Sequence, residues 1–482
     1  MPDSFSDLKR KSLENRLAAL HEEFEAANAQ LNHALSGVDR VRIQRQIKSL
    51  EEDITKTESE LGEIKGDSVK PDEPESPEAQ TRTLLKLQLL QRQPNKIEIR
   101  GIGVPGGGLP KAQVDLPYSL DELPAILKAL DVGEYIEARF KSEYKQALER
   151  LGLLNNNRLH PNFHAIVGQK LYHALFTGEI LTEFAIAERA SQPIACQLGF
   201  DPQDVILAQF PWELIHDGSL HRVPIRGGVE LTRYVTLADP PEPLETQLPL
   251  RILFISPRPR DDDPLRVQAS ALLDGLESLR EGGQLTWKQL DPPTWEALEE
   301  CLYDETFDII HFDGHGSFAR VCPACTKAHY PSSQTCVRCS ADMSDSAPQG
   351  YLHFEDGGQG LDRVSVEDMK LVLANSQTHL VFLSACGTGV VKGVSVFNGI
   401  APGLIQIGIP AVVAMQGSPP DASSMRFVER FYGSLAKGKR VPEAVNGGRR
   451  AIFRSRPLAW FMPVVYLRSS DDTYGRLFNL SE

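Results

Sequence analysis

The 482-residue sequence predicts an α/β fold, in which helices flank a sheet with buried parallel strands. Two observations carry this prediction. From residue 97 onward, short strand patterns alternate with segments of helical periodicity. Within that region, residues 309–316 (IIHFDGHG) and 380–389 (LVFLSACGTG) are apolar runs that end at glycine. Such runs are typical of parallel strands that are buried on both faces.

Residues 5–65 carry two apolar seams with the spacing of packed helices. The first seam runs from Leu13 to Leu31 and the second from Ile43 to Ile64. The seams are out of register, and the break falls at residues 36–39 (SGVD), where glycine can end one helix and serine or aspartate can cap the next. We predict a helical hairpin within residues 1–65 that serves as an adaptor; a solvated coiled-coil spacer is the alternative.

Residues 66–83 are predicted to form a flexible linker. The stretch 66–82 (GDSVKPDEPESPEAQTR) is acidic, rich in proline and nearly devoid of large apolar side chains, so it cannot bury a core. The hairpin would then move independently of the part of the chain that follows.

Beyond the linker, predicted strands and helices alternate. Strands are expected at residues 97–100, 193–198, 231–235 and 250–255, and helices at 120–150 and 164–177. The glycine-rich stretch 101–108 (GIGVPGGG) lacks the Gly-Lys-Ser/Thr of a phosphate-binding loop and contains a proline. We therefore interpret it as a turn between strands.

Each of the two long apolar runs is followed by a reactive side chain, His315 in the first case and Cys386 in the second. Chemistry in open α/β sheets takes place at the carboxyl ends of strands, so both side chains are expected at one edge of one sheet. A Cys–His pair in that position is typical of a cysteine hydrolase. The alternative is a buried structural thiol and a hydrogen-bonded histidine. His311, inside the first run, is expected to be structural.

Four further cysteines form two Cys-x2-Cys pairs separated by ten residues: Cys322, Cys325, Cys336 and Cys339. This spacing predicts a zinc ribbon, because four thiolates complete a tetrahedral site. With no ligand position left open, the zinc would be structural. The polar spacer would need the metal to fold, and disulfides are the alternative. We place this zinc-ribbon insertion at residues 320–342, where it could shape a substrate cleft or bind a partner.

These motifs resemble the CHAT family of caspase-like cysteine proteases, which are related to separase. The resemblance covers roughly residues 96–470. It rests on HFDGHG ending at Gly316, on LSACGT around Cys386, and on residues 211–217 (PWELIHD), 427–435 and 460–466. His315 and Cys386 lie 71 residues apart, or 53 once the 18-residue cysteine module is set aside, against roughly 50 in caspases.

The resemblance implies a caspase-like sheet flanked by helices. It implies a non-catalytic half at residues 84–243 and a protease half at residues 244–482. It also implies that the backbone N–H groups of Gly316 and Cys386 form the oxyanion hole.

The resemblance also indicates where a substrate side chain would bind. Ser384 lies two residues before the proposed nucleophile, at a position that lines the first specificity pocket in related folds. Residues 415–421 align with a family turn that usually carries an acidic residue after a tryptophan, so the resemblance implies that Asp421 forms a pocket floor that selects Arg or Lys; in this chain Gln416 replaces the family tryptophan. The alternative for Asp421 is to cap the helix that begins near residue 422.

Composition is that of an ordinary globular protein, with 41% hydrophobic and 24% charged residues. The formal net charge of −14 argues against general affinity for nucleic acid or anionic membranes. No apolar segment approaches the roughly 20 residues that span a bilayer, and the first residues do not resemble a secretory signal. We expect a cytoplasmic protein whose thiols stay reduced.

The sequence therefore predicts a cytoplasmic cysteine endopeptidase that cleaves protein substrates through Cys386 and His315. Family members often act in bacterial defence or regulated cell death after activation by partners. We expect activation here by a protein partner or by self-association through residues 5–65. Two alternatives stay open. One is a catalytically inactive CHAT scaffold that binds partners through the hairpin and the zinc module, and the other is a zinc-dependent nucleic-acid adaptor.

Overall fold

The chain divides into two compact units, residues 1–80 and 81–482. The computed structural model describes residues 82–93, 95–119, 121–132, 140–190, 192–200, 207–218, 228–234, 243–258, 272–329, 333–358, 360–374, 376–385, 396–416, 421–455, 459–468 and 473–480. The predicted hairpin within residues 1–65 lies outside the described residues, as does nearly all of the predicted linker.

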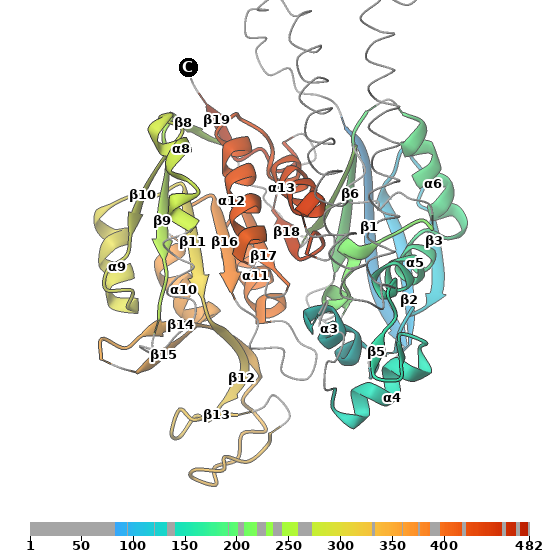
Figure 1. Cartoon of the computed structure of the whole chain (residues 1–482), viewed down its shortest axis with the longest axis horizontal. Coiled ribbons are helices and arrows are strands. Elements are labelled where there is room, and N and C mark those ends of the chain that lie inside the picture. The colour runs from blue at the N-terminus through green and yellow to red at the C-terminus, as the bar shows by residue number, and fades with distance from the viewer. Residues whose placement is uncertain are drawn as a thin grey trace, which may run out of the picture. The chain divides into compact units, whose positions relative to one another are not determined.

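A large mixed sheet forms the centre of the second unit (Figure 1). Its strands are β1 (Thr83–Gln93), β2 (Lys96–Gly103), β3 (Lys111–Asp115), β6 (Ile194–Phe200), β7 (Val229–Tyr234), β9 (Leu250–Ile255), β10 (Leu285–Gln289), β11 (Ile309–Gly314), β16 (Leu380–Ala385), β17 (Ala411–Met415) and β18 (Pro463–Leu467). Across the sheet their order is β10-β9-β11-β16-β17-β18-β7-β6-β1-β2-β3.

Five neighbouring strands, β10, β9, β11, β16 and β17, run parallel to one another. Their carboxyl ends therefore meet at one edge of the sheet. β18 runs antiparallel to β17 and parallel to β7, so the two halves of the chain contribute to one continuous sheet. The remaining strands comprise the parallel β7, β6 and β1 and the antiparallel β2 and β3.

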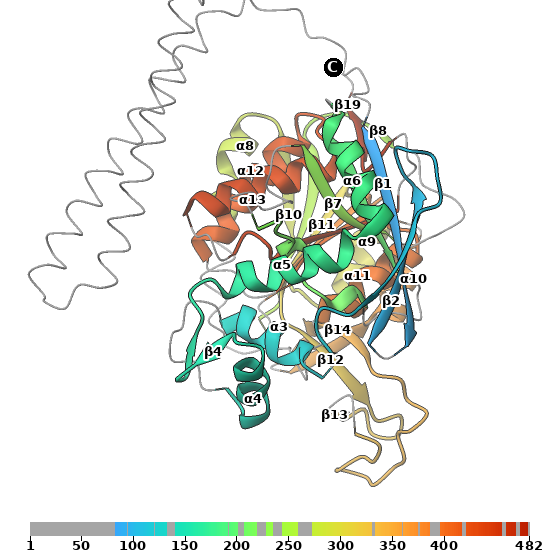
Figure 2. The same cartoon turned by 90° about the vertical axis from the view of Figure 1, so that its right-hand side faces the viewer.

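Helices cover both faces of the parallel strands. The helices among the described residues of the unit are α3 (Leu123–Val132), α4 (Ser142–Arg150), α5 (Phe163–Leu175), α6 (Gly178–Arg189), α8 (Glu277–Glu281), α9 (Trp295–Asp304), α10 (Val366–Leu373), α11 (Val396–Gln406), α12 (Asp421–Leu435) and α13 (Val441–Ser455). Figure 2 shows α12 and α13 on one side of these strands and α9, α10 and α11 on the other.

The hydrophobic core follows from the alternation of side chains along these strands. Phe254 and Phe382 belong to the core cluster that includes α12 and α13. Their chain neighbours Leu253 and Leu383 belong to the cluster that includes α9, α10 and α11. Because both faces are covered, the inner strands β9, β11, β16 and β17 are mostly apolar, and this pattern made the runs in β11 and β16 recognisable in the sequence.

Several shorter elements surround the central sheet. A four-stranded sheet with the order β13-β12-β14-β15 begins directly beyond β11. The bounds of these elements are β12 (Gly316–Val321), β13 (Ala328–His329), β14 (Gln349–Glu355), β15 (Leu361–Ser365), β4 (Leu154–Asn155), β5 (Arg158–Leu159), β8 (Leu244–Thr246), β19 (Phe478–Leu480), and the short 3-10 helices η1 (Leu207–Gln209) and η2 (Trp212–Leu214). The cysteine-rich segment follows β12.

The sequence predicted most of these elements at the right places. The strands expected at 97–100, 193–198, 231–235 and 250–255 correspond to β2, β6, β7 and β9, and the glycine-rich stretch leads from β2 into the antiparallel β3. The single helix expected at 120–150 is wrong, because α3 ends at Val132 and α4 begins at Ser142 after a non-helical residue. Gly133, a poor helix former, directly follows α3 in the sequence.

No helix in the described part of the chain is both long enough and apolar enough to cross a membrane.

Candidate active site and cysteine cluster

β11 and β16, the strands that lead to the two reactive residues, are parallel neighbours in register. Asp313 pairs with Ser384, and Gly314 pairs with Ala385. His315 directly follows Gly314, and in the sequence Cys386 directly follows Ala385. Cys386 itself lies outside the described residues. The two strands thus end level with each other at the same edge of the sheet.

The backbone around His315 is held by the small sheet beyond β11. The carbonyl oxygen of His315 accepts a hydrogen bond from the backbone N–H of His353 at 3.0 Å. Gly316 opens β12 and pairs with Leu352 of β14. Burial, together with the charges of Arg363 and His315, lowers the pKa of His353 to about 3, so this neighbouring imidazole is neutral at physiological pH.

His311 has the structural role that was expected of it. Its Nδ1 lies 2.7 Å from the hydroxyl oxygen of Tyr432 on α12. The ring stacks on Phe382, with centroids 4.6 Å apart, and also packs against Phe254. Burial lowers the pKa of His311 to about 3, so it is a neutral core residue that ties β11 to the helical layer.

Asp313 forms a buried ion pair with Arg258, which follows β9. An Nη2–H of Arg258 donates to Oδ2 of Asp313 at 2.5 Å, and Nη1–H donates to the Asp313 carbonyl oxygen at 2.5 Å. Burial raises the pKa of Asp313 above its usual range, against opposing effects of Arg258, of a hydrogen bond with Ser384 and of His315. Sequence reasoning missed Arg258, although its place just after a buried strand was a usable signal.

Of the two predicted specificity residues, the structure describes the side chain of Ser384 but not that of Asp421. Ser384 is buried beside Asp313 and takes part in the hydrogen bond just named. Asp421 is the first residue of α12, but its side chain lies outside the described part of the chain. Gln416, which replaces the family tryptophan, donates from Nε2 to a carboxylate oxygen of Glu213 at 2.7 Å.

The four cysteines of the predicted zinc ribbon come together. Their Sγ atoms all lie within 4.8 Å of one another, and none of the four forms a disulfide. The Sγ atoms of Cys322 and Cys339 are 3.5 Å apart, and those of Cys325 and Cys336 are 3.6 Å apart. Four thiolates at about 2.3 Å from a tetrahedral zinc ion would be separated by about 3.8 Å. The cluster therefore fits a metal ion of this kind.

The surroundings of the cysteine cluster match a structural site. Nε2 of His329 lies 3.2 Å from the sulfur of Cys336, and the backbone N–H of Arg338 donates to the same sulfur at 3.3 Å. Met343 packs on the buried cysteines as a small apolar core. His329 is thus placed as a hydrogen-bond partner of one of the clustered cysteines.

Comparisons with known proteins were made for the whole chain. The model of the CHAT domain matches residues 165–466, and that of effector-associated domain 9 matches residues 3–64. No curated protein matches. Among solved structures, the Saccharomyces cerevisiae separase–securin complex is similar, with a TM-score of 0.42 and 11% identity over 84% of this chain and 31% of that chain.

The chain therefore spans less than a third of the solved chain that it resembles. The CHAT match, by contrast, covers more than half of the sequence and includes both strands that lead to His315 and Cys386. On this ground the protein belongs to the CHAT domain family.

Proposed function

We propose that this protein is a cysteine endopeptidase with Cys386 as nucleophile and His315 as general base and acid. The register of β11 and β16 carries the proposal, because the two residues follow the paired Gly314 and Ala385 at one sheet edge. Membership of a family of caspase-like proteases supports it.

The proposed reaction follows the usual course of thiol proteases. His315 accepts the thiol proton of Cys386, and the thiolate attacks the carbonyl carbon of the scissile peptide bond. The backbone N–H groups of Gly316 and Cys386 stabilise the resulting oxyanion. His315 then protonates the leaving amine, and water hydrolyses the thioester.

The residue before the cut would be bound near Ser384 and Asp421. We propose that the Asp421 carboxylate selects a lysine or arginine side chain in this first pocket. Residues 5–65 would control the activity, by binding an activating partner or by bringing copies of the chain together. The match to effector-associated domain 9 over residues 3–64 supports that role.

Cleavage of a proteome-derived peptide library by the full chain tests the proposed function. Wild type and Cys386→Ala are compared by mass-spectrometric mapping of cleavage sites, with the chain fused to an inducible dimerisation domain. Only the wild type is expected to cleave peptides. Its cleavage is expected to increase on dimerisation and to occur after lysine or arginine residues. Equal patterns from both proteins would refute the peptidase.

The inactive-scaffold alternative makes the opposite prediction for the thiol. A scaffold without catalytic chemistry needs no reactive Cys386, whereas a protease thiol paired with a histidine reacts quickly at neutral pH. Labelling by a thiol-directed probe, located by mass spectrometry, distinguishes the two functions even when no substrate is known.

We further propose that Cys322, Cys325, Cys336 and Cys339 hold one structural zinc ion. The metal would supply folding energy to the segment and take no part in the reaction. Elemental analysis is expected to find one zinc per chain in the wild type and none in Cys322→Ser/Cys336→Ser. Limited proteolysis should then cut the variant within residues 322–343.

A matched control is Cys301→Ser, which removes a buried cysteine outside the cluster. It is expected to keep its zinc and its resistance to proteolysis. Full zinc content in the double variant would show that the metal sits elsewhere.

A further inference from the structure

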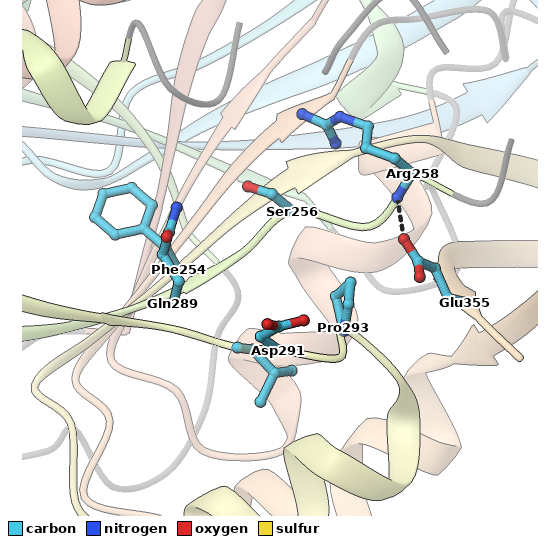
Figure 3. A pocket seen from close by; sticks show the side chains of 8 residues that line it. Phe254, Ser256, Arg258, Gln289, Asp291, Pro293 and Glu355 are labelled. Atoms are coloured by element: carbon cyan, nitrogen blue, oxygen red, sulfur yellow. Dashed lines mark hydrogen bonds between the residues drawn. The ribbon is translucent and has the colours of Figure 1, made fainter. Parts of the chain in front are cut away.

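A pocket of about 400 Å³ opens at the carboxyl ends of β9 and β10 (Figure 3). Its lining combines apolar walls with polar groups: Phe254, Ser256, Arg258, Gln289, Leu290, Asp291, Pro293 and Glu355. A cavity of this size accommodates a long amino-acid side chain together with part of its backbone. None of these residues belongs to the proposed dyad or to the first specificity pocket.

The pocket lies beside the proposed dyad, on the side of His315. Phe254 of β9 pairs with His311 of β11, which in turn pairs with Phe382 of β16. The three strands are parallel. Beyond its carboxyl end, β9 leads to Arg258, β11 leads to His315, and β16 leads to the residue after Ala385. The order across the sheet is therefore pocket, then histidine, then the strand that leads to the nucleophile.

The chemistry of peptide cleavage determines which part of a substrate reaches the pocket. The nucleophile attacks the carbonyl carbon, whereas the nitrogen of the leaving amine receives its proton from the histidine. The chain that follows the cut therefore departs over the histidine side. On this sheet β9 and the pocket lie on that side of β11.

The charges in the pocket favour a basic side chain. Asp291 and Glu355 contribute two carboxylates, and Arg258 is the basic residue of the lining. The guanidinium of Arg258 is already neutralised by its ion pair with Asp313. An acidic ligand would face two carboxylates without a free counter-charge, whereas lysine or arginine would meet both and lay its methylene stem against Phe254 and Leu290.

Arg258 is a largely buried part of the pocket wall. Arg258 is 6% exposed, and its Nε has no hydrogen-bond partner among the described residues. Its backbone N–H donates to Oε1 of Glu355 at 2.8 Å, as the dashed line in Figure 3 marks.

We propose that this pocket binds a lysine or arginine side chain in the substrate segment that follows the cut. Asp291 and Glu355 serve as its counter-charges. The proposal rests on the proposed endopeptidase function and adds a second basic position to its substrates.

Binding of product-side peptides tests the pocket without any need for catalysis. Labelled peptides with a free amino terminus carry lysine, norleucine or glutamate at the first or second position. Their affinity for full-length Cys386→Ala is measured by fluorescence anisotropy. The lysine peptide is expected to bind at least about tenfold more tightly than the norleucine peptide, the size of a charged hydrogen bond. Asp291→Asn/Glu355→Gln should abolish the difference.

Two controls keep the outcome clear. Glu299→Gln/Asp304→Asn removes the same charge from exposed positions on α9 and should leave the lysine preference unchanged. Asp291→Asn alone changes an exposed residue at the rim, so reduced preference in this variant cannot be blamed on unfolding. Preference for glutamate, equal binding of all three peptides, or no binding at millimolar peptide would overturn the proposal.

Cleavage assays separate this proposal from the function on which it rests. The wild type could cleave peptides without preferring a basic residue after the cut, with the same cleavage sites in Asp291→Asn/Glu355→Gln. In that case the pocket proposal fails and the peptidase proposal stands. If wild type cleaves nothing while the lysine peptide still binds selectively, the pocket stands as a binding site and the peptidase fails.

Discussion

Replacing His315 by alanine is expected to lower kcat/KM for a cleaved peptide by about 10²- to 10⁴-fold. In the proposed mechanism this variant lacks both the base that forms the thiolate and the acid that protonates the leaving amine. The fold should survive, because the backbone of His315 is held through its carbonyl oxygen and by the start of β12.

Alkylation of Cys386 at a series of pH values gives a second, substrate-independent measurement. In the proposed dyad a protonated His315 stabilises the thiolate, so alkylation of the wild type is expected to begin at low pH. In His315→Ala the midpoint should move upward, toward the value of about 8.5 for a free thiol. His173→Ala, which alters an exposed histidine on α5, serves as the control and should match wild type. An unchanged midpoint in His315→Ala would remove His315 from the mechanism.

Replacing Glu213 by alanine is expected to lower the free energy of unfolding by about 3–5 kcal/mol. Glu213 and Arg233 are both fully buried, and the guanidinium donates to the two carboxylate oxygens at 3.0 and 2.6 Å. Without Glu213, Arg233 keeps the hydroxyl of Tyr466 and backbone carbonyls as acceptors but has lost its counter-charge. Gln416 loses its acceptor as well.

Urea-induced unfolding followed by tryptophan fluorescence measures this loss, and the buried Trp212 is adjacent in the sequence to the altered residue. Glu277→Ala removes the exposed partner of Arg280 and should change stability by less than about 0.5 kcal/mol. The double variant Glu213→Met/Arg233→Met is expected to recover part of the loss, since it leaves no buried charge unpaired. A double variant as unstable as the sum of both single variants would contradict this account.

The network around Glu213 gives the motif PWELIHD a physical meaning. Glu213 lies in η2, Arg233 in β7, and Gln416 directly follows β17. The carboxylate therefore ties the first half of the chain to the segment that leads toward Asp421. Sequence reasoning recognised the motif by resemblance but assigned no partner to its glutamate.

The cysteine cluster and the two strands at the candidate site could be predicted from the sequence for the same reason. The signal of each is local: a Cys-x2-Cys pair brings two thiols together within one turn, and a buried strand is apolar along its own length. The glycines after β11 and β16 further marked where those runs end.

The sequence by itself thus determined the α/β class, the strands that precede His315 and Cys386, and the four cysteines that gather into one cluster. Only the tertiary structure decided that Arg258 pairs with Asp313, 55 residues away, and that Gln416 reaches Glu213, 203 residues away. It also decided that β17, β18 and β7 join both halves into one sheet. Such pairings depend on strand order and register, which arise from packing among distant segments and leave no periodic trace in the local sequence.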